Sequence, residues 1–236
     1  MAQRAVILAG GTGGLGRAAV QAFLAAGDQV VVPYRREQEF AALQQTVGAA
    51  ASRLTGVVSD VTDLDSVAAL VARCAQQHGR VDVLVNTVGG YAGGVNLWQT
   101  DPAVLEQQLT LNLRAGFVLA RVALPFMLAQ RSGVVVNVAS RAAVDHGAGA
   151  SAYAASKAAA VAMMDSLAAE LRGTGVRVNS ILPSIIDTPA NRKAMPQADF
   201  SRWPQPEAIA EVILFLASPA ARVIHGATIP VYGAEV

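Results

Sequence analysis

A glycine-rich loop near the N-terminus constrains the fold more than any other feature of the chain. The preceding run, Arg4–Ala9, is short and apolar with β-branched residues, which predicts a buried strand. Residues 14–26 carry apolar side chains at helical spacing, and Gly27 ends the predicted helix. Between strand and helix, five of seven residues are glycines: Gly10, Gly11, Gly13, Gly14 and Gly16.

Glycines at a strand-to-helix turn permit positive φ angles and let backbone N–H groups approach a pyrophosphate. The loop fits two spacings, G-x-G-x-x-G and G-x-x-x-G-x-G, and a glycine-rich turn without a ligand is the alternative. The dinucleotide hypothesis assigns cofactor contacts to Gly10, Thr12, Gly13, Gly14, Leu15 and Gly16.

Strand-like and helix-like segments alternate along the rest of the chain. Further strands are expected at 29–32, 54–59, 81–85, 134–139, 176–182 and 227–231. Further helices are expected at 37–51, 63–77, 101–130, 151–172 and 206–216. This alternation predicts a single α/β domain over 1–236, a doubly wound parallel sheet of about seven strands with helices on both faces. Residues 184–205 are expected to form a ligand-enclosing loop, because such sheets bind ligands beyond their carboxyl ends.

Composition excludes several classes of function. Eighteen basic and seventeen acidic residues give a net charge of +1, so no broad field for nucleic acid is expected. Cys74 is the only cysteine, and three histidines (His78, His146 and His225) lie far apart, so we expect no disulfide and no metal site. The apolar runs are too short for a signal sequence or a membrane span, which favours the cytoplasm.

The residues after the second predicted strand bear on the choice of dinucleotide. An acid at this place binds the ribose hydroxyls of NAD, whereas an arginine accommodates the 2′-phosphate of NADP. The strand leads into Tyr34, Arg35 and Arg36, with no acid before Glu37. Arg35 therefore favours NADP(H) over NAD(H), and solvated loop arginines are the alternative interpretation.

A serine, a tyrosine and a lysine form the second chemical signal. Tyr153 and Lys157 are four residues apart on one predicted helix, so both lie on the same face. A free phenol has a pKa of about 10, and a neighbouring ammonium lowers it toward the working range. Ser140 ends the fifth predicted strand, where its hydroxyl can polarise a carbonyl. A surface Tyr–Lys pair is the alternative.

With these residues in place, the chain resembles the short-chain dehydrogenase/reductase family over essentially its whole length. Asp60 and Val61 match the segment after the third strand that contacts adenine, and residues 86–89 stand where the family has Asn-Asn-Ala-Gly. The family's four catalytic positions correspond to Asn112, Ser140, Tyr153 and Lys157. The resemblance implies cofactor contacts at Gly10, Gly14, Gly16, Asp60, Val61, Asn86, Gly89, Tyr153, Lys157, Pro183, Ile186 and Thr188.

The resemblance also implies a Rossmann-type fold and hydride transfer between nicotinamide and a carbonyl or alcohol. Tyr153 is expected to be the acid/base, Ser140 to hold the substrate oxygen, and Lys157 to lower the tyrosine pKa and bind the nicotinamide ribose. Asn112 is expected to anchor a water that relays protons to Lys157. Departures from the family pattern at Ala9, Ser184 and Tyr232 affect loop detail and remove no reacting group.

Three alternatives stay open. The segment 187–203 is similar to the corresponding loop of dihydropteridine reductases, but that branch uses NADH through an acid and lacks the serine. A 3-oxoacyl thioester reductase would need a basic patch for an acidic carrier, for which Arg121 and Arg131 are candidates. An NADP(H)-sensing regulator without catalysis is the non-enzymatic alternative.

The substrate is expected to be a small carbonyl or alcohol compound held by loops around the catalytic group. Candidate contacts are Tyr91, Trp98, His146 and Trp203, each with ordinary packing or solvent exposure as the alternative. The alanine-rich helices 105–130 and 153–172 resemble those through which the family forms dimers and tetramers. We therefore expect a homotetramer or a homodimer.

Overall fold

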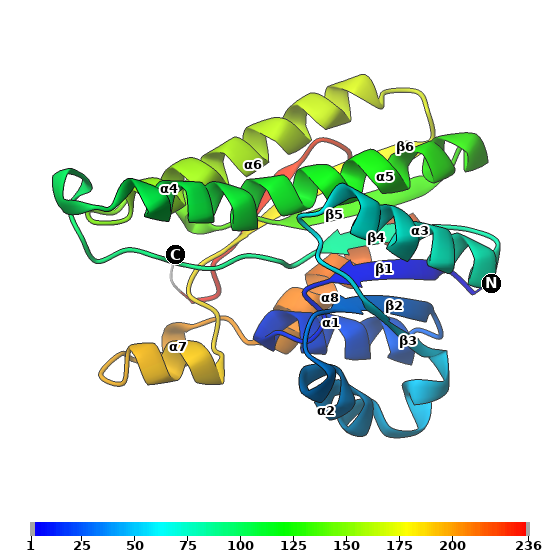
Figure 1. The fold of residues 1–236 in the computed structure, drawn as a ribbon, viewed down its shortest axis with the longest axis horizontal. Helices are drawn as coiled ribbons and strands as arrows, with labels where there is room; N and C mark the ends of the chain where they lie inside the picture. The colour runs from blue at the N-terminus through cyan, green and yellow to red at the C-terminus, as the bar shows by residue number, and fades with distance from the viewer. Residues whose placement is uncertain (1–2, 235–236) are drawn as a thin grey trace.

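A computed structural model, which describes residues 3–234, contains one seven-stranded parallel sheet in the order β3-β2-β1-β4-β5-β6-β7 (Figure 1). The predicted fold class is confirmed, although the ends of the expected domain, 1–2 and 235–236, lie outside the described residues. The strands are β1 (Ala5–Ala9), β2 (Gln29–Tyr34), β3 (Leu54–Val58), β4 (Val83–Asn86), β5 (Gly133–Val138), β6 (Val176–Pro183) and β7 (Thr228–Val231).

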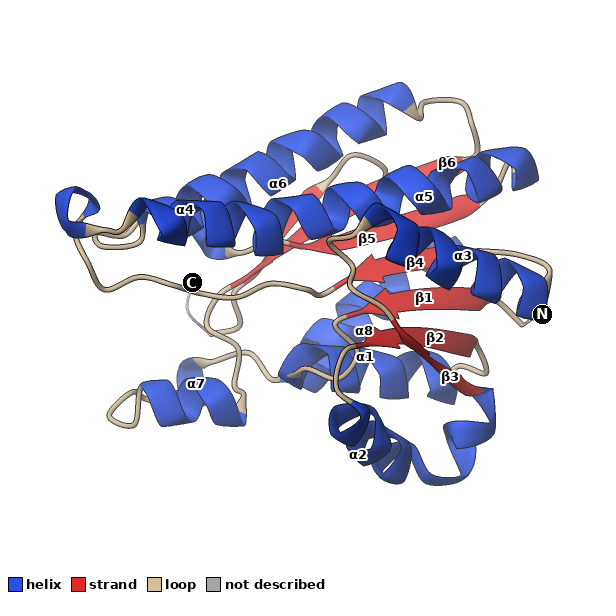
Figure 2. Ribbon diagram, in the orientation of Figure 1, coloured by secondary structure: helices blue, strands red, loops and turns tan. Residues whose placement is uncertain are grey.

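Helices cover both faces of this sheet (Figure 2). They are α1 (Gly14–Ala25), α2 (Glu37–Val47), α3 (Leu64–His78), α4 (Pro102–Leu109), α5 (Ala115–Gln130), α6 (Ser151–Glu170), α7 (Pro189–Ala194) and α8 (Pro206–Leu216). On β1, Val6 and Leu8 pack toward α1 and α8, while Ile7 packs toward α3 and α5. Burial on both faces explains why β1 is apolar throughout rather than alternating.

The order of strands reverses beside β1, which pairs with both β2 and β4. The chain leaves β1 toward one edge of the sheet and returns at β4 toward the other edge. Loops that follow such neighbours diverge and leave a crevice at the carboxyl ends of the strands. The glycine loop after β1 and the segment after β4 both begin at this place.

Two predicted boundaries are wrong. The helix expected over 37–51 ends at Val47, because Gly48 adopts a φ of 54° and a 3-10 segment follows. The expected loop 184–205 contains α7 and a 3-10 turn, Phe200–Arg202. Thr188 caps α7 by accepting the N–H of Asn191, and Pro189 occupies its first turn. A capping residue followed by proline is a helix-start signal that the loop interpretation overlooked.

The helix expected over 101–130 is interrupted by a π-helical turn, Thr110–Arg114, between α4 and α5. By length and composition alone, the helical stretch Pro102–Gln130 could cross a membrane, because an 18-residue window within it has a mean hydropathy of 1.4. Half of that window is buried, and residues such as Leu119 and Met127 belong to the core between α5 and the sheet. The stretch therefore packs as a core helix of this fold.

Candidate active site

The glycine loop is held so tightly that a Cβ at four of its glycines would clash with neighbouring atoms. Gly10 has a φ of 81°, in the left-handed region that favours glycine. A Cβ at Gly16 would lie 2.0 Å from the carbonyl oxygen of Gly10, and one at Gly14 would lie 2.7 Å from the methyl of Thr188. The first residues of α1 therefore pack directly on the loop and on the segment after β6.

The start of α1 fits an anionic ligand. Gly13 occupies the N-cap position without a capping side chain, and the first turn contains no acid. By contrast, Asp63 caps α3 by accepting the N–H of Ser66 at 2.8 Å. Because α1 lacks such a cap, its first N–H groups and the positive end of its dipole remain available to a pyrophosphate. The residues present therefore fit the dinucleotide that the sequence predicts.

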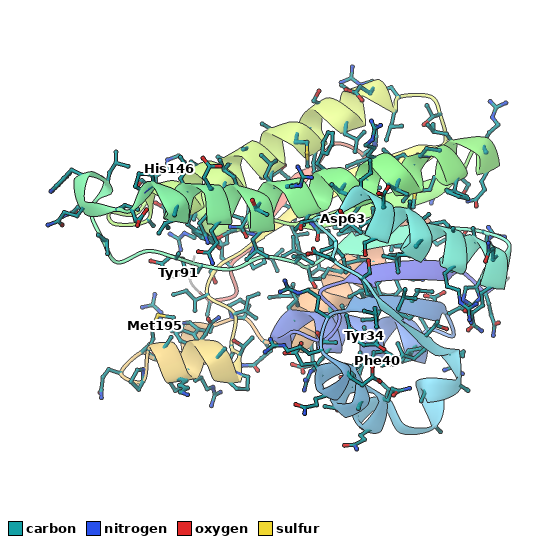
Figure 3. The ribbon with its side chains drawn as sticks, in the orientation of Figure 1. Tyr34, Phe40, Asp63, Tyr91, His146 and Met195 are labelled. Carbon is teal, nitrogen blue, oxygen red and sulfur yellow. The ribbon has the colours of Figure 1, made fainter. Side chains whose placement is uncertain are left out.

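The ends of β2 and β3 lie beside this loop. Arg35 is exposed directly after Tyr34, whose ring stacks on Phe40 at 4.7 Å (Figure 3). Asp60 accepts the N–H of Thr62 at 2.9 Å and its hydroxyl at 2.7 Å. These two hydrogen bonds lower the pKa of Asp60, and the positive charge of Arg35 adds a smaller contribution in the same direction. Asp60 and Arg35 are therefore neighbours at one edge of the crevice.

Ser140 and Tyr153 meet at the carboxyl end of β5. Ser140 caps a 3-10 turn, Arg141–Ala143, and its Oγ accepts the N–H of Ala142 at 3.2 Å. Tyr153 lies in the first turn of α6, half-buried, with Ser140 as a hydrogen-bond partner of its phenol. The helix and the strand thus bring together two hydroxyls that are well separated in the sequence.

Lys157 is buried one turn further along α6. Its Nζ lies 6.0 Å from the centroid of the Tyr153 ring and donates to the carbonyl oxygen of Val138 at 3.3 Å. Burial lowers the pKa of Lys157 to about 8. A Cβ at Gly89 would lie 2.8 Å from this Nζ, so the backbone after β4 passes directly beside the ammonium.

The pKa of Tyr153 corrects one expectation. It is raised above the usual value of about 10, chiefly because burial disfavours the phenolate. The hydrogen bond with Ser140 lowers the pKa, and electrostatic interaction with Tyr91 raises it. The expected lowering by Lys157 is wrong for this arrangement, because burial of the phenol outweighs any effect of an ammonium 6.0 Å from the ring centroid.

Asn112 lies in the π-helical turn and is fully engaged by protein groups. Its Oδ1 accepts the N–H of Gly90 at 3.0 Å, and its Nδ2 lies 3.1 Å from the Gly90 carbonyl oxygen. Nδ2 also reaches Gln108 Oε1 at 3.1 Å and Ser156 Oγ at 3.0 Å. Ser156 donates to the carbonyl oxygen of Tyr153 at 2.7 Å. The amide therefore ties the segment after β4 to the turn that carries the tyrosine.

Two members of this network, Gln108 and Ser156, were not predicted as site residues. Both are buried, and Gln108 precedes Asn112 by four residues, a spacing that places two side chains on the same face of a helix.

Asn86 also forms hydrogen bonds within the fold, since its Nδ2 donates to Asn137 Oδ1 at 3.0 Å and its Oδ1 accepts the N–H of Val88. It therefore shapes the segment that leads to Gly89.

The segment after β6 is fixed by a buried carboxylate. Asp187 pairs with Arg192 through both oxygens, and Gln205 donates to Asp187 Oδ2 at 2.7 Å. These hydrogen bonds hold the pKa of Asp187 at about 2. Ile186 is also held, because its carbonyl oxygen accepts from Asn191 Nδ2 at 2.8 Å. Thr188 is thus placed beside Gly14 of the glycine loop, and Pro183 and Ile186 precede it in the same segment at the end of β6.

The predicted substrate contacts separate into two groups. Tyr91 packs edge-on against Tyr153 and is 65% exposed, so it lies at the site. Trp203 is buried, and its ring centroid lies 4.9 Å from that of Phe200. His146 is exposed in the loop before α6. Ordinary packing and solvent exposure were the alternative interpretations of these two residues. Figure 3 places Tyr91 and Met195 on opposite sides of the region beyond the sheet edge. Trp98 is 81% exposed.

A cavity of about 160 Å³ lies beyond Tyr91. The loop after β4 contributes Gly93 and Val95, and the start of α6 contributes Ser151 and Ala152. Tyr91 lies beside this space, because a Cβ at the lining residue Gly93 would be 2.3 Å from the Tyr91 hydroxyl. In the described residues, no group of three or more His, Cys, Asp or Glu side chains is placed to hold a metal ion.

Comparisons with known proteins agree with this geometry. The family model for short chain dehydrogenases matches residues 4–199. The chain is 30% identical to a 3-oxoacyl-(acyl-carrier-protein) reductase of Thermotoga maritima, over 98% of this chain and 96% of that protein. It is 33% identical to 2-(R)-hydroxypropyl-CoM dehydrogenase of Xanthobacter autotrophicus, with 98% of each chain covered.

Among solved structures, an actinorhodin polyketide ketoreductase with NADPH has a TM-score of 0.91 and 25% identity, covering 99% of this chain and 98% of that one. The chain therefore belongs to the short-chain dehydrogenase/reductase family, whose members support a general activity as a nicotinamide-dependent oxidoreductase. The comparisons do not show the narrower resemblance of the loop 187–203 to dihydropteridine reductases.

Proposed function

We propose that the protein is an NADP(H)-preferring oxidoreductase that interconverts a carbonyl compound and an alcohol, with Tyr153 as the acid/base. The observation that carries the proposal is the meeting of Ser140, Tyr153 and Lys157 beside Gly89, at the edge of the sheet where the glycine loop ends. Bound NADP(H) supplies the hydride or accepts it. The residues of this chain bind, orient and move the proton.

The cofactor would extend along the carboxyl edge of the sheet. The glycine loop and the start of α1 would hold the pyrophosphate, and Arg35 the 2′-phosphate. Asp60 and Val61 would border the adenine. Lys157 and Tyr153 would bind the nicotinamide ribose. The remaining contacts would come from Asn86, Gly89, Pro183, Ile186 and Thr188.

Tyr153 would serve as the proton donor in the direction of reduction. Burial raises the pKa of its phenol, which keeps the proton available for a carbonyl oxygen that becomes an alcohol. The Ser140 hydroxyl would hold that oxygen by a hydrogen bond. Asn112 would position Gly90 and, in the role predicted from the sequence, anchor the water that relays protons toward Lys157.

A paired screen tests this proposal. NADPH and NADH would each be offered with ketones, quinones, quinonoid pterins and acyl thioesters, and dinucleotide oxidation would be followed by absorbance. We expect turnover of at least one carbonyl class with NADPH, and loss of that turnover in Tyr153→Phe while NADPH affinity stays nearly intact. Full activity of Tyr153→Phe would contradict the assignment of the acid/base.

A 3-oxoacyl thioester reductase is the second candidate, because two relatives carry that name at 30% and 33% identity. An acidic carrier would require basic residues near the entrance. Arg121 and Arg131 are both exposed, but Arg131 directly precedes β5 and therefore lies at the end of that strand opposite to Ser140, so it does not border the entrance. Activity with carrier-bound and not with free thioesters would favour this candidate. Tight NADPH binding without turnover of any carbonyl would favour a regulator.

We also propose that the chain assembles with itself. The outer surface of α4, α5 and α6 has a groove lined by Leu109, Leu113, Phe117 and Met163, and Phe117 is 52% exposed. Apolar surface of this kind marks interaction sites. Light scattering after size exclusion would report a tetramer or a dimer, and a monomer at all concentrations would contradict the proposal. A cytoplasmic location stays a prediction.

A further inference from the structure

Glu39 connects the glycine loop to the arginines that follow β2. Its Oε1 pairs with the Arg36 guanidinium at 2.6 Å, and its Oε2 lies 3.4 Å from the hydroxyl of Thr12. Thr12 lies within the loop, and its carbonyl oxygen accepts from Arg17 Nε at 2.9 Å. A carboxylate from the first turn of α2 thus lies beside the proposed pyrophosphate cradle.

This position is where the adenosine ribose of a dinucleotide lies in folds of this kind. The groups at the end of β2 discriminate the two cofactors, since an acid accepts from ribose hydroxyls and an arginine binds the 2′-phosphate. The positive charge of Arg35 acts on Asp60, and Arg36 forms an ion pair with Glu39. The pattern of the sequence showed two arginines there. The structure shows that one of them is paired with a carboxylate.

We propose that Glu39 is a specificity-determining residue that weakens discrimination in favour of NADP(H). This inference rests on the proposed function, since it concerns the same dinucleotide site. The Glu39 carboxylate neutralises Arg36 and adds negative charge beside Thr12. A 2′-phosphate held by Arg35 is therefore repelled by Glu39, and it gains Arg36 as a second partner only by displacing Glu39 from that arginine. NADH lacks that phosphate, and its ribose hydroxyls can donate to Glu39.

Substitution of Glu39 by glutamine should therefore change the two affinities differently. Arg36 becomes free to bind the 2′-phosphate, and NADPH should bind about five- to ten-fold more tightly, as expected for one unit charge near a protein surface. NADH should bind equally or more weakly, since an amide oxygen is a weaker acceptor than a carboxylate. A merely structural role of Glu39 would move both affinities in the same direction.

Glu37 provides a matched control on the same helical turn. Its carboxylate accepts from the Tyr34 hydroxyl at 2.7 Å rather than from an arginine or from the glycine loop. Glu37→Gln removes the same charge from the chain, so it reports the effect of net charge alone. We expect its ratio of NADPH to NADH affinity to stay within about two-fold of the parent protein.

The experiment is a fluorescence titration of the substrate-free protein with NADPH and with NADH, at two salt concentrations. The proteins compared are the parent, Glu39→Gln, Glu37→Gln, Arg36→Met and the double variant Arg36→Met with Glu39→Gln. In the Arg36→Met background the gain from Glu39→Gln should shrink, because the released arginine is absent. The gain should also fall at high salt.

Equal shifts of the NADPH-to-NADH ratio in Glu39→Gln and Glu37→Gln would overturn the assignment of Glu39, as would an unchanged ratio in Glu39→Gln. Both results leave the proposed function standing, since dinucleotide still binds. If neither dinucleotide binds to the parent protein, the proposed function itself fails. The two failures are therefore distinguishable without any knowledge of the substrate.

Discussion

The ring of Tyr91 stands nearly perpendicular to the ring of Tyr153, with centroids 5.0 Å apart and 77° between the ring planes. Edge-to-face packing of this kind fixes the orientation of both rings. Tyr91 belongs to the loop after β4, and Tyr153 belongs to α6. The contact therefore lets a substrate loop act directly on the proposed acid/base.

The first prediction concerns the phenol of Tyr91. In Tyr91→Phe the ring packing stays while the ionisable group whose negative charge raises the pKa of Tyr153 is removed, so that pKa should fall. Alcohol oxidation needs the phenolate of Tyr153, and its rate rises with pH below the pKa. The rising limb of the oxidation profile should move to lower pH. A limb that stays in place would show that Tyr91 does not influence the acid/base.

Ser140→Ala should move the same profile in the opposite direction. Ser140 lowers the pKa of Tyr153 through a hydrogen bond, so its loss should raise that pKa further and shift the oxidation limb to higher pH. The rate of reduction should also fall by about 10²-fold or more, because the substrate oxygen loses a hydrogen-bond donor. The check is a pH profile of oxidation and reduction with the substrate found by the screen. An unchanged limb would exclude Ser140 as a partner of the phenol.

The carboxylate of Asp187 should control order in the substrate loop. Asp187→Asn loses the ion pair with Arg192, so trypsin should cleave after Lys193 and Arg202 faster than in the parent protein. Asp199→Asn is the control, because the Asp199 carboxylate is exposed and, within the part of the chain that the structure describes, accepts hydrogen bonds only from the nearby Ser201. Equal cleavage of both variants and the parent would contradict the role of Asp187.

The same residue should contribute to stability in a defined range of pH. The pKa of Asp187 falls from 3.8 to about 2 on folding, so its contribution is complete above about pH 4 and is lost as the pH falls toward 2. The difference in melting temperature between the parent and Asp187→Asn should therefore be constant from pH 7 to 5 and vanish near pH 2. A difference that persists at pH 2 would have another origin.

Gly16→Ala should be far more damaging than Gly13→Ala. A Cβ at Gly16 would lie 2.0 Å from a backbone carbonyl oxygen, whereas one at Gly13 would lie 3.3 Å from the same atom. The Gly16 variant must distort the loop, so we expect a loss of about 2 kcal/mol or more in the free energy of unfolding and no measurable dinucleotide binding. Urea unfolding of both variants, with dinucleotide titration, checks this comparison.

The sequence predicted the fold well because the pattern of strands and helices is regular. Runs such as Ala5–Ala9 are apolar throughout, and the glycine loop marks the first turn. Two boundaries failed where the backbone takes a local conformation, at Gly48 and at the capped helix that begins with Pro189. The positive φ of Gly48 and the capping side chain of Thr188 determine where those elements end and begin. Neither feature changes the spacing of apolar residues from which the elements were predicted.

The sequence predicted which residues form the candidate site, but not how deeply each is buried or what it contacts. Ser140, Tyr153 and Lys157 lie together as their spacing indicated, but the sign of the tyrosine shift depends on burial, which no spacing reports. Gln108 and Ser156 were missed because their roles arise from contacts between α4 and α6. The pairing of Glu39 with Arg36 follows an i, i+3 spacing, and its approach to Thr12 needed the structure.

The π-helical turn Thr110–Arg114 has a consequence for how this chain tolerates length changes. A π turn holds one residue more than the regular α-helix needs, so a single deletion within it would restore continuous α-helical geometry. Each residue of an α-helix turns it by about 100°, and the deletion would rotate the face that carries Asn112 away from Gly90 while the rest of α5 stayed packed. We therefore expect such a deletion to disturb the geometry of the candidate active site more than the stability of the helix. Loss of one residue in this turn would then reduce activity while the protein still folds.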